Sequence, residues 1–122
     1  MKKILIIDDD RDLNRLTRIV LTKEGYEVET IHDAESGINY AKEYNPDLIL
    51  MDVMLPGIKG TEAVNRIKTE GSSNGLQIIF LTASVSPRAK DEMLIVNGLS
   101  YPTLGKPYEI EKLLYVVNKA LN

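Results

Sequence analysis

The sequence predicts an α/β fold, a doubly wound (βα)5 arrangement in which helices cover both faces of a five-stranded parallel sheet. Two observations carry this prediction. Short apolar runs alternate five times with longer stretches of helical periodicity. In addition, the first, third and fourth runs are apolar throughout, which is typical of strands buried on both faces of a parallel sheet. Gly, Pro, Asn and Ser clusters separate the elements and indicate loops.

The elements follow in order from this periodicity. Strands are expected at residues 3–8, 27–31, 48–52, 77–82 and 101–104. Helices are expected at residues 12–24, 34–44, 60–70, 87–97 and 108–121. Gly25 and Gly98 directly follow predicted helices, where left-handed caps are common. The second strand alternates and the fifth contains Pro102, so both are expected at the edges of the sheet.

Composition indicates the class of protein. With 122 residues, 43% of them hydrophobic and 27% charged, the chain is expected to form one domain over residues 1–122. The net charge of -3, with Lys and Arg dispersed, gives no basic tract for nucleic acid or an anionic membrane. Apolar runs are far shorter than a membrane span of about 20 residues, and no signal peptide is seen. The absence of cysteine excludes thiolate sites. We expect a cytoplasmic protein.

Acidic residues directly follow two of the predicted strands. Asp8, Asp9 and Asp10 follow the first run, and Asp52 ends the third. Parallel strands end at the same sheet edge, so these carboxylates should converge. Two such charges about 4 Å apart repel by roughly 4 kcal/mol at an effective dielectric near 20, so the cluster needs a cation or protons. Oxygen ligands select a hard ion, and we expect Mg²⁺.

Together these positions resemble, along the whole chain, the receiver domains of two-component response regulators in bacteria and archaea. The loop that begins at Asp52 also follows the pattern of that family, with Pro56 and Gly60 in place. The positions that match the family are Asp8 and Asp9 after the first strand, Asp52 after the third, Thr82 and Ala83 after the fourth, and Lys106 with Pro107 after the fifth. The resemblance implies the flavodoxin-like strand order 2-1-3-4-5.

The resemblance also implies a role for each of these residues. Asp52 would be the phosphoacceptor, taking a phosphoryl group from a sensor histidine kinase or a histidine phosphotransfer protein. Such a domain is a signalling module, with at most self-phosphorylation and self-dephosphorylation. The Mg²⁺ ligands would be Asp8 through a water, Asp9, Asp52 and the backbone carbonyl of Met54. The phosphoryl oxygens would bind the Thr82 hydroxyl, the backbone N–H of Ala83 and the Lys106 ammonium.

Two segments bear on how a phosphorylated state would be transmitted. Family members usually place an aromatic switch residue three positions before the lysine, where this chain has Thr103. Tyr101 could serve instead if a bulge moved it toward that place. The four apolar residues 93–96 exceed what one helix stripe buries, and Tyr108, Tyr115 and Val116 are left over in the last helix. We expect a dimer or effector face on the fourth helix, fifth strand and fifth helix.

The acidic residues and the predicted fold also fit other classes of protein. The Asp-x-Asp that starts at Asp8 is similar to the nucleophile motif of haloacid-dehalogenase-type phosphohydrolases, although the usual Gly-Thr does not follow it. A pseudo-receiver that only binds partners is a second alternative, and a flavodoxin is a weaker third, since acids replace phosphate donors in the first loop.

Several polar residues are expected to have ordinary roles. We expect Asp10 to cap a helix and His32 to be exposed, far from the site. The basic stripe of Arg11, Arg15 and Arg18 is either a solvated helix face or a surface that steers an acidic partner.

Overall fold

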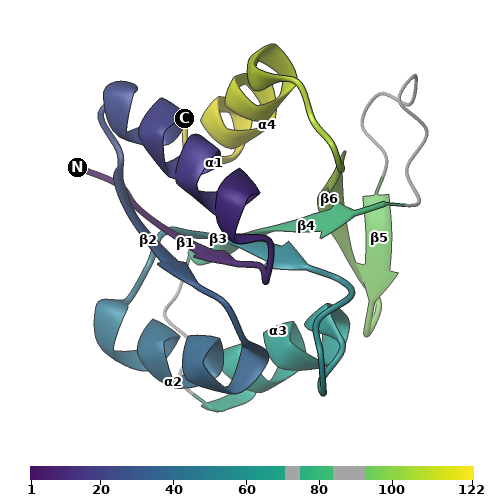
Figure 1. Cartoon of the computed structure of the whole chain (residues 1–122). Helices are drawn as coiled ribbons and strands as arrows, with labels where there is room; N and C mark the ends of the chain where they lie inside the picture. The colour runs from purple at the N-terminus through teal and green to yellow at the C-terminus, as the bar shows by residue number, and fades with distance from the viewer. Residues whose placement is uncertain (71–74, 84–92) are drawn as a thin grey trace.

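The computed structural model describes residues 1–70, 75–83 and 93–122. A central sheet lies between two layers of helices, with α1 and α4 on one face and α2 and α3 on the other (Figure 1). The elements in chain order are β1 (Lys3–Ile7), α1 (Arg11–Lys23), β2 (Glu27–Ile31), α2 (Ala34–Tyr44), β3 (Leu48–Asp52), α3 (Gly60–Glu70), β4 (Gln77–Thr82), β5 (Met93–Val96), β6 (Leu99–Gly105) and α4 (Ile110–Leu121).

The sheet has the order β2-β1-β3-β4-β6-β5, parallel throughout except for β5, which pairs antiparallel with β6. The predicted α/β class and the order 2-1-3-4 are confirmed, and β6 takes the place of the fifth predicted strand. The predicted number of strands is wrong, because the described residues form six. β2 is an edge strand as expected, whereas β6 is not, since β5 covers it.

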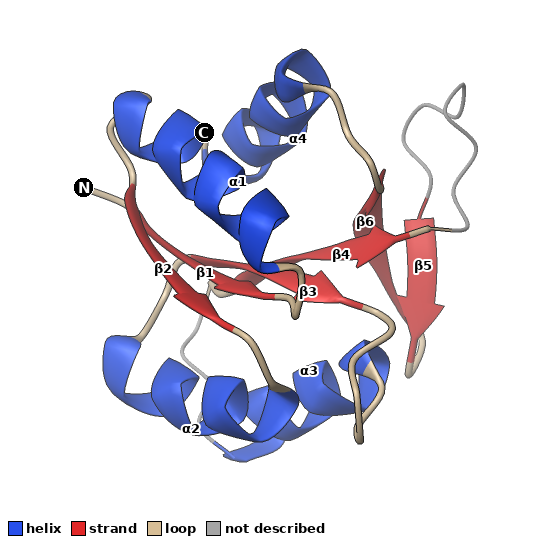
Figure 2. Cartoon of the chain, in the orientation of Figure 1, coloured by secondary structure: helices blue, strands red, loops and turns tan. Residues whose placement is uncertain are grey.

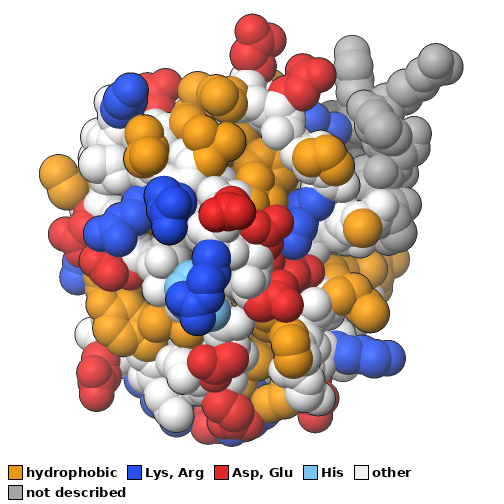
Figure 3. All heavy atoms as spheres, viewed as in Figure 1, with side chains coloured by type: hydrophobic (Ala, Val, Ile, Leu, Met, Phe, Trp, Pro, Cys, Tyr) orange, Lys and Arg blue, Asp and Glu red, His pale blue; other side chains and the backbone are white. Residues whose placement is uncertain are grey.

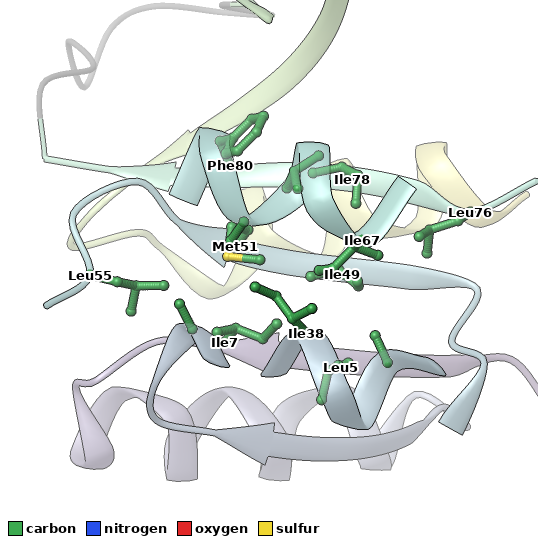
Figure 4. Packing of buried hydrophobic residues seen from close by; sticks show 14 of the residues in the cluster. Leu5, Ile7, Ile38, Ile49, Met51, Leu55, Ile67, Leu76, Ile78 and Phe80 are labelled. Atoms are coloured by element: carbon green, nitrogen blue, oxygen red, sulfur yellow. The ribbon is translucent and has the colours of Figure 1, made fainter. Parts of the chain in front are cut away.

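Strand residues alternate between two cores, one on each face of the sheet. In β1, Ile4 and Ile6 pack toward the α1 and α4 side, whereas Leu5 and Ile7 pack toward α2 and α3. Figure 4 shows the second core, in which strand side chains meet Ile38 of α2 and Ile67 of α3 from opposite directions. Burying one such side chain stabilises a fold by about 1.5–3 kcal/mol. The double burial fixes the register of β1 and β3, and therefore where each strand ends.

The helix predicted over residues 87–97 is wrong in its second half, where residues 93–96 form β5; residues 87–92 lie outside the described part of the chain. Figure 2 shows β5 and β6 as an antiparallel pair of strands beyond β4. Val96 pairs with Leu99 across a two-residue turn at Asn97 (φ 51°) and Gly98 (φ 80°). An Asn-Gly pair with both φ positive forms the type I′ turn that matches strand twist. Gly98 is therefore a hairpin residue and not a helix cap, whereas Gly25 follows α1 with φ 96°, as predicted.

The hairpin packs back against the body of the domain. Leu94 and Val96 face the core on the α2 and α3 side, and the Asn97 side chain donates a hydrogen bond to Asn65 of α3 at 2.9 Å. Met93 and Ile95, on the alternate positions, are exposed. The four apolar residues 93–96 therefore divide between two faces of a strand. Among the described helices, none combines the length and the apolar content that a membrane crossing requires.

Candidate functional site

The site lies at the sheet edge where the parallel strands end. Asp8 directly follows β1, Asp52 ends β3, Thr82 ends β4, and Lys106 directly follows β6. Backbone pairing continues past the strands, because the Lys106 N–H donates to the Thr82 carbonyl at 2.9 Å. The structure thus brings together four strand ends that the sequence separates by up to 98 positions.

Three carboxylates form the acidic centre of this edge. Asp8, Asp9 and Asp52 each place a carboxylate oxygen within 4.8 Å of the others, close enough to hold one metal ion. Asp8 is 0% exposed and Asp52 is 5% exposed, whereas Asp9 faces solvent. The cluster therefore has two buried ligands and one open side, and its all-oxygen donor set fits a hard divalent cation such as Mg²⁺.

Lys106 supplies the positive charge that balances the buried acids. Its ammonium lies 2.9 and 3.2 Å from the two carboxylate oxygens of Asp8 and 3.3 Å from Oδ2 of Asp52. Burial lowers the pKa of Lys106, but its hydrogen bond to Asp8 and the charges of Asp8 and Asp52 outweigh this and raise that pKa overall. The ammonium therefore stays protonated and holds both carboxylates.

The Asp8 carboxyl is buried beside the negative charge of Asp52. Burial raises the pKa of the Asp8 carboxyl and outweighs the hydrogen bonds from the Asp10 N–H, at 3.0 Å, and from Lys106. The charge of Asp52 raises it further. The cluster thus carries more negative charge than Lys106 alone satisfies, which favours an added cation.

The loop after β3 presents Asp52 through close backbone packing. The Met54 N–H donates to Oδ1 of Asp52 at 3.0 Å, and the Gly60 N–H donates to the Val53 carbonyl at 2.9 Å. A Cβ at Gly60 would lie 2.1 Å from the Asp52 carbonyl oxygen, so only glycine fits there without moving the strand end. The Met54 side chain is exposed, and the ligand role of its carbonyl stays a prediction.

The predicted phosphoryl ligands Thr82 and Ala83 lie at the same edge, where Thr82 is partly buried and Ala83 is exposed. Asp10 caps α1 as expected, with its carboxylate accepting from the Leu13 N–H at 3.1 Å. Figure 3 shows acidic side chains gathered near the middle of the face that it presents.

Tyr101 points into the core and not toward a bulge. It is 8% exposed, and its ring meets Phe80 edge to face at 5.5 Å between centroids, with the Lys68 ammonium 5.4 Å from the Tyr101 ring. β6 pairs in unbroken register, first with β5 and then with β4, so no bulge displaces Tyr101 toward Thr103. Both residues lie on the same face of β6, two positions apart, and Thr103 is also buried.

Two residues beside the acids were missed or misjudged. Asn14, almost fully buried in α1, donates to the Asp8 carbonyl oxygen at 2.7 Å. The expectation that His32 is exposed and remote is wrong, because its Nδ1 lies 3.3 Å from Asn14 Nδ2 and 3.4 Å from the Asp8 carbonyl oxygen. β2 pairs with β1, so the residue after β2 reaches the end of β1. An asparagine on the buried stripe of a helix was the signal for Asn14.

Comparison with known proteins agrees with this geometry. The family model described as "Response regulator receiver domain" matches residues 4–118, which include all of the acids, Thr82 and Lys106. The chain belongs to the response regulator receiver domain family. As a receiver domain it is a signalling module of a two-component system. The hydrolase alternative fails, because Asp8, its required nucleophile, is fully buried and both its oxygens accept from Lys106.

Two curated relatives are similar to this receiver domain. It is 37% identical over 118 residues to the uncharacterized transcriptional regulatory protein YkoG of Bacillus subtilis, covering 97% of this chain and 50% of that protein. It is also 37% identical to the response regulator ArlR of Staphylococcus aureus, covering 93% of this chain and 50% of ArlR. The receiver domain thus spans about half the length of these relatives.

The structural neighbours are receivers of similar length. The chemotaxis response regulator CheY4 of Vibrio cholerae superposes with a TM-score of 0.84 at 30% identity, covering 98% of each chain. One chain of the crystal structure of the histidine kinase ThkA in complex with the response regulator TrrA matches with a TM-score of 0.81 at 29% identity. The match covers 100% of this domain and 100% of that chain.

Proposed function

We propose that residues 1–122 form one receiver domain that takes a phosphoryl group on Asp52 in a Mg²⁺-dependent reaction and thereby switches an output surface. The observation that carries the proposal is the constellation at the strand ends, in which Lys106 joins Asp8 and Asp52 while Asp9 stays open to solvent. Phosphoryl transfer depends mainly on positioning and on charge stabilisation, and this constellation provides both.

Asp52 is the acid best suited to act as the nucleophile. Asp8 is fully buried and gives both oxygens to Lys106, so it is held as a charge partner. Asp52 accepts one bond on each oxygen, from the Met54 N–H and from Lys106, which leaves further lone pairs free on both. A carboxylate oxygen of Asp52 attacks phosphorus, the bond from phosphorus to the donor nitrogen or oxygen breaks, and an acyl phosphate forms.

The metal site and the phosphoryl site share Asp52. Asp9, Asp52 and the Met54 carbonyl would ligate Mg²⁺ directly, with Asp8 acting through a water. When bound, Mg²⁺ neutralises charge on the transferring group. Lys106 would turn from Asp8 toward a phosphoryl oxygen, with the Thr82 hydroxyl and the Ala83 N–H on two others. The Lys106 stem is flexible enough for this small shift.

The output face expected from the sequence is revised here, because residues 93–96 form β5 and not part of a helix. The N–H of Lys106 is already bonded to the Thr82 carbonyl, so closure at these residues would act on β6 and on β5 beyond it. We propose β5, β6 and α4 as the face for an effector or a second copy. Buried Tyr101 connects this face to Phe80 of β4 and is the candidate aromatic coupling residue.

The proposed donor is a sensor histidine kinase or a histidine phosphotransfer protein, acting in the cytoplasm. The complex of ThkA with TrrA supports a kinase partner, since this domain matches a chain of that structure over its full length. The catalysis assigned to the domain itself is limited to self-phosphorylation and self-dephosphorylation.

The test is incubation with a small phosphodonor and Mg²⁺, followed by intact mass. We expect one added phosphoryl group, lost with chelator and in Asp52→Asn, and kept in the control variant Asp12→Asn, which changes an exposed residue of α1. No addition to the wild-type domain under any donor would favour the pseudo-receiver alternative.

A further inference from the structure

A cavity lined mostly by polar and charged residues lies between α1 and the end of β2. Its volume is about 180 Å³. It shares no residue with the acids, Thr82 or Lys106. The residues that line it are Arg11, Asn14, Arg15, Arg18, Thr30 and His32. In Figure 3 the pale blue surface of the single histidine lies among Lys and Arg side chains.

The lining carries unbalanced positive charge, although the protein has a net charge of -3. Arg11, Arg15 and Arg18 follow one another at helical spacing and face one side of α1. Arg18 pairs with Glu29 only at 3.9 Å, with both side chains about half exposed, which makes a weak pair. Within the described ranges, neither Arg11 nor Arg15 forms an ion pair. The nearby Asp10 carboxylate already accepts from the Leu13 N–H.

Asn14, Thr30 and His32 complete the lining of the cavity beside the three arginines. The Asn14 side chain donates to the Asp8 carbonyl oxygen at 2.7 Å, and His32 Nδ1 lies 3.3 Å from the Asn14 amide nitrogen and 3.4 Å from the same carbonyl oxygen. None of the described residues that line the cavity carries a carboxylate.

We propose that this cavity is a second anion site, which binds a free phosphate-sized oxyanion with two negative charges. Guanidinium groups bind such oxyanions through paired hydrogen bonds, and a dianion can engage two of them together. The cavity has room for one phosphate with several waters, whereas it falls below the 300 Å³ or more typical of sites for larger organic ligands. The site is separate from the phosphoacceptor chemistry at Asp52.

The probe is inorganic phosphate, titrated into the full chain while amide chemical shifts are followed by NMR, with sodium chloride at matched ionic strength as a second arm. We expect saturable shifts at the Asn14 side-chain amide and the Thr30 backbone amide with phosphate, and none with chloride. Arg15→Gln should weaken binding about tenfold, the loss expected for one charge-assisted hydrogen bond. Arg66→Gln, which removes the same charge from α3, should leave the affinity unchanged.

The Asp52→Asn chain separates this site from the phosphoacceptor site. If phosphate still saturates the Asn14 and Thr30 shifts in that variant, the anion site stands whether or not Asp52 is the acceptor. Shifts that never saturate, that chloride reproduces, that Arg15→Gln and Arg66→Gln weaken equally, or that vanish in Asp52→Asn would each overturn the proposal.

Discussion

The Lys106 ammonium lies closer to Asp8, at 2.9 Å, than to Asp52, at 3.3 Å. In the unphosphorylated domain the lysine therefore serves first as the counter-charge of a fully buried acid. A phosphoryl group on Asp52 would compete with Asp8 for the same ammonium.

Removing the ammonium should destabilise the fold more than removing a surface lysine. Lys106→Met leaves buried Asp8 without its charge partner. We expect the free energy of unfolding, measured with urea, to fall by about 1–3 kcal/mol. The control Lys42→Met breaks an exposed pair with Glu70 at 3.1 Å and should cost less than about 1 kcal/mol. Equal losses in the two variants would show that Lys106 does not stabilise Asp8.

Asp8 should make the stability of the metal-free domain fall as pH rises. Burial raises the pKa of Asp8 in the folded state above its ordinary value of 3.8, which holds in the unfolded state. At pH values between the unfolded-state and folded-state pKa, the folded state therefore binds more protons than the unfolded state. Stability is then lost as pH rises through this window. Urea unfolding with chelator should find Asp8→Asn more stable than wild type at neutral pH, with the gain shrinking toward pH 3.8.

Added Mg²⁺ should reverse that ranking, because the ion stabilises the ionised acids of the wild-type domain. An Asp8→Asn variant that is less stable than wild type in chelator would contradict the raised pKa.

Substitutions of the neighbouring acids Asp9 and Asp10 should have different effects on Mg²⁺ binding and on stability. Asp10→Ala removes the cap bond to the Leu13 N–H, and we expect a loss of about 1 kcal/mol in stability with Mg²⁺ binding retained. Asp9→Ala should lose Mg²⁺ binding with little cost in stability, because Asp9 is exposed and its removal relieves repulsion. Calorimetry with Mg²⁺ and urea unfolding measure both. Loss of Mg²⁺ binding in Asp10→Ala would make Asp10 a ligand.

Phosphorylation should change the hydrogen exchange of β6 and β5. With beryllofluoride and Mg²⁺ as a phosphoryl mimic, hydrogen exchange should change most in Met93–Val96 and Leu99–Gly105, through the bond from the Lys106 N–H to the Thr82 carbonyl. α2 follows β2, which lies at the other end of the sheet from β5, and serves as the internal control. Its hydrogen exchange should stay unchanged. Changes confined to the loops around Asp9 and Asp52 would leave β5 and β6 without a role in output.

The acid positions could be predicted because apolar runs buried on both faces mark the strand ends directly. Asp8 and Asp52 follow such runs, and parallel pairing then places them together. The preference of Lys106 for Asp8 could not be predicted, since it depends on differences of tenths of an ångström between backbone positions at three strand ends.

The helix predicted over 87–97 is wrong at residues 93–96, because four consecutive apolar residues were taken for a helix with an extra exposed face. A strand explains them better, since its alternate residues face the core and solvent, and Asn97-Gly98 is a strong hairpin signal. His32 was misjudged because its neighbours in space come from strand pairing and not from the local sequence.

The most direct measurement is the position of the phosphoryl group among three acids that lie within 4.8 Å of one another. The domain is phosphorylated with a small donor and Mg²⁺, the acyl phosphate is reduced with borohydride to homoserine, and the altered residue is found by peptide mass spectrometry. We predict homoserine at position 52 alone. Homoserine at position 8 or 9, or unchanged yield in Asp52→Asn, would contradict it.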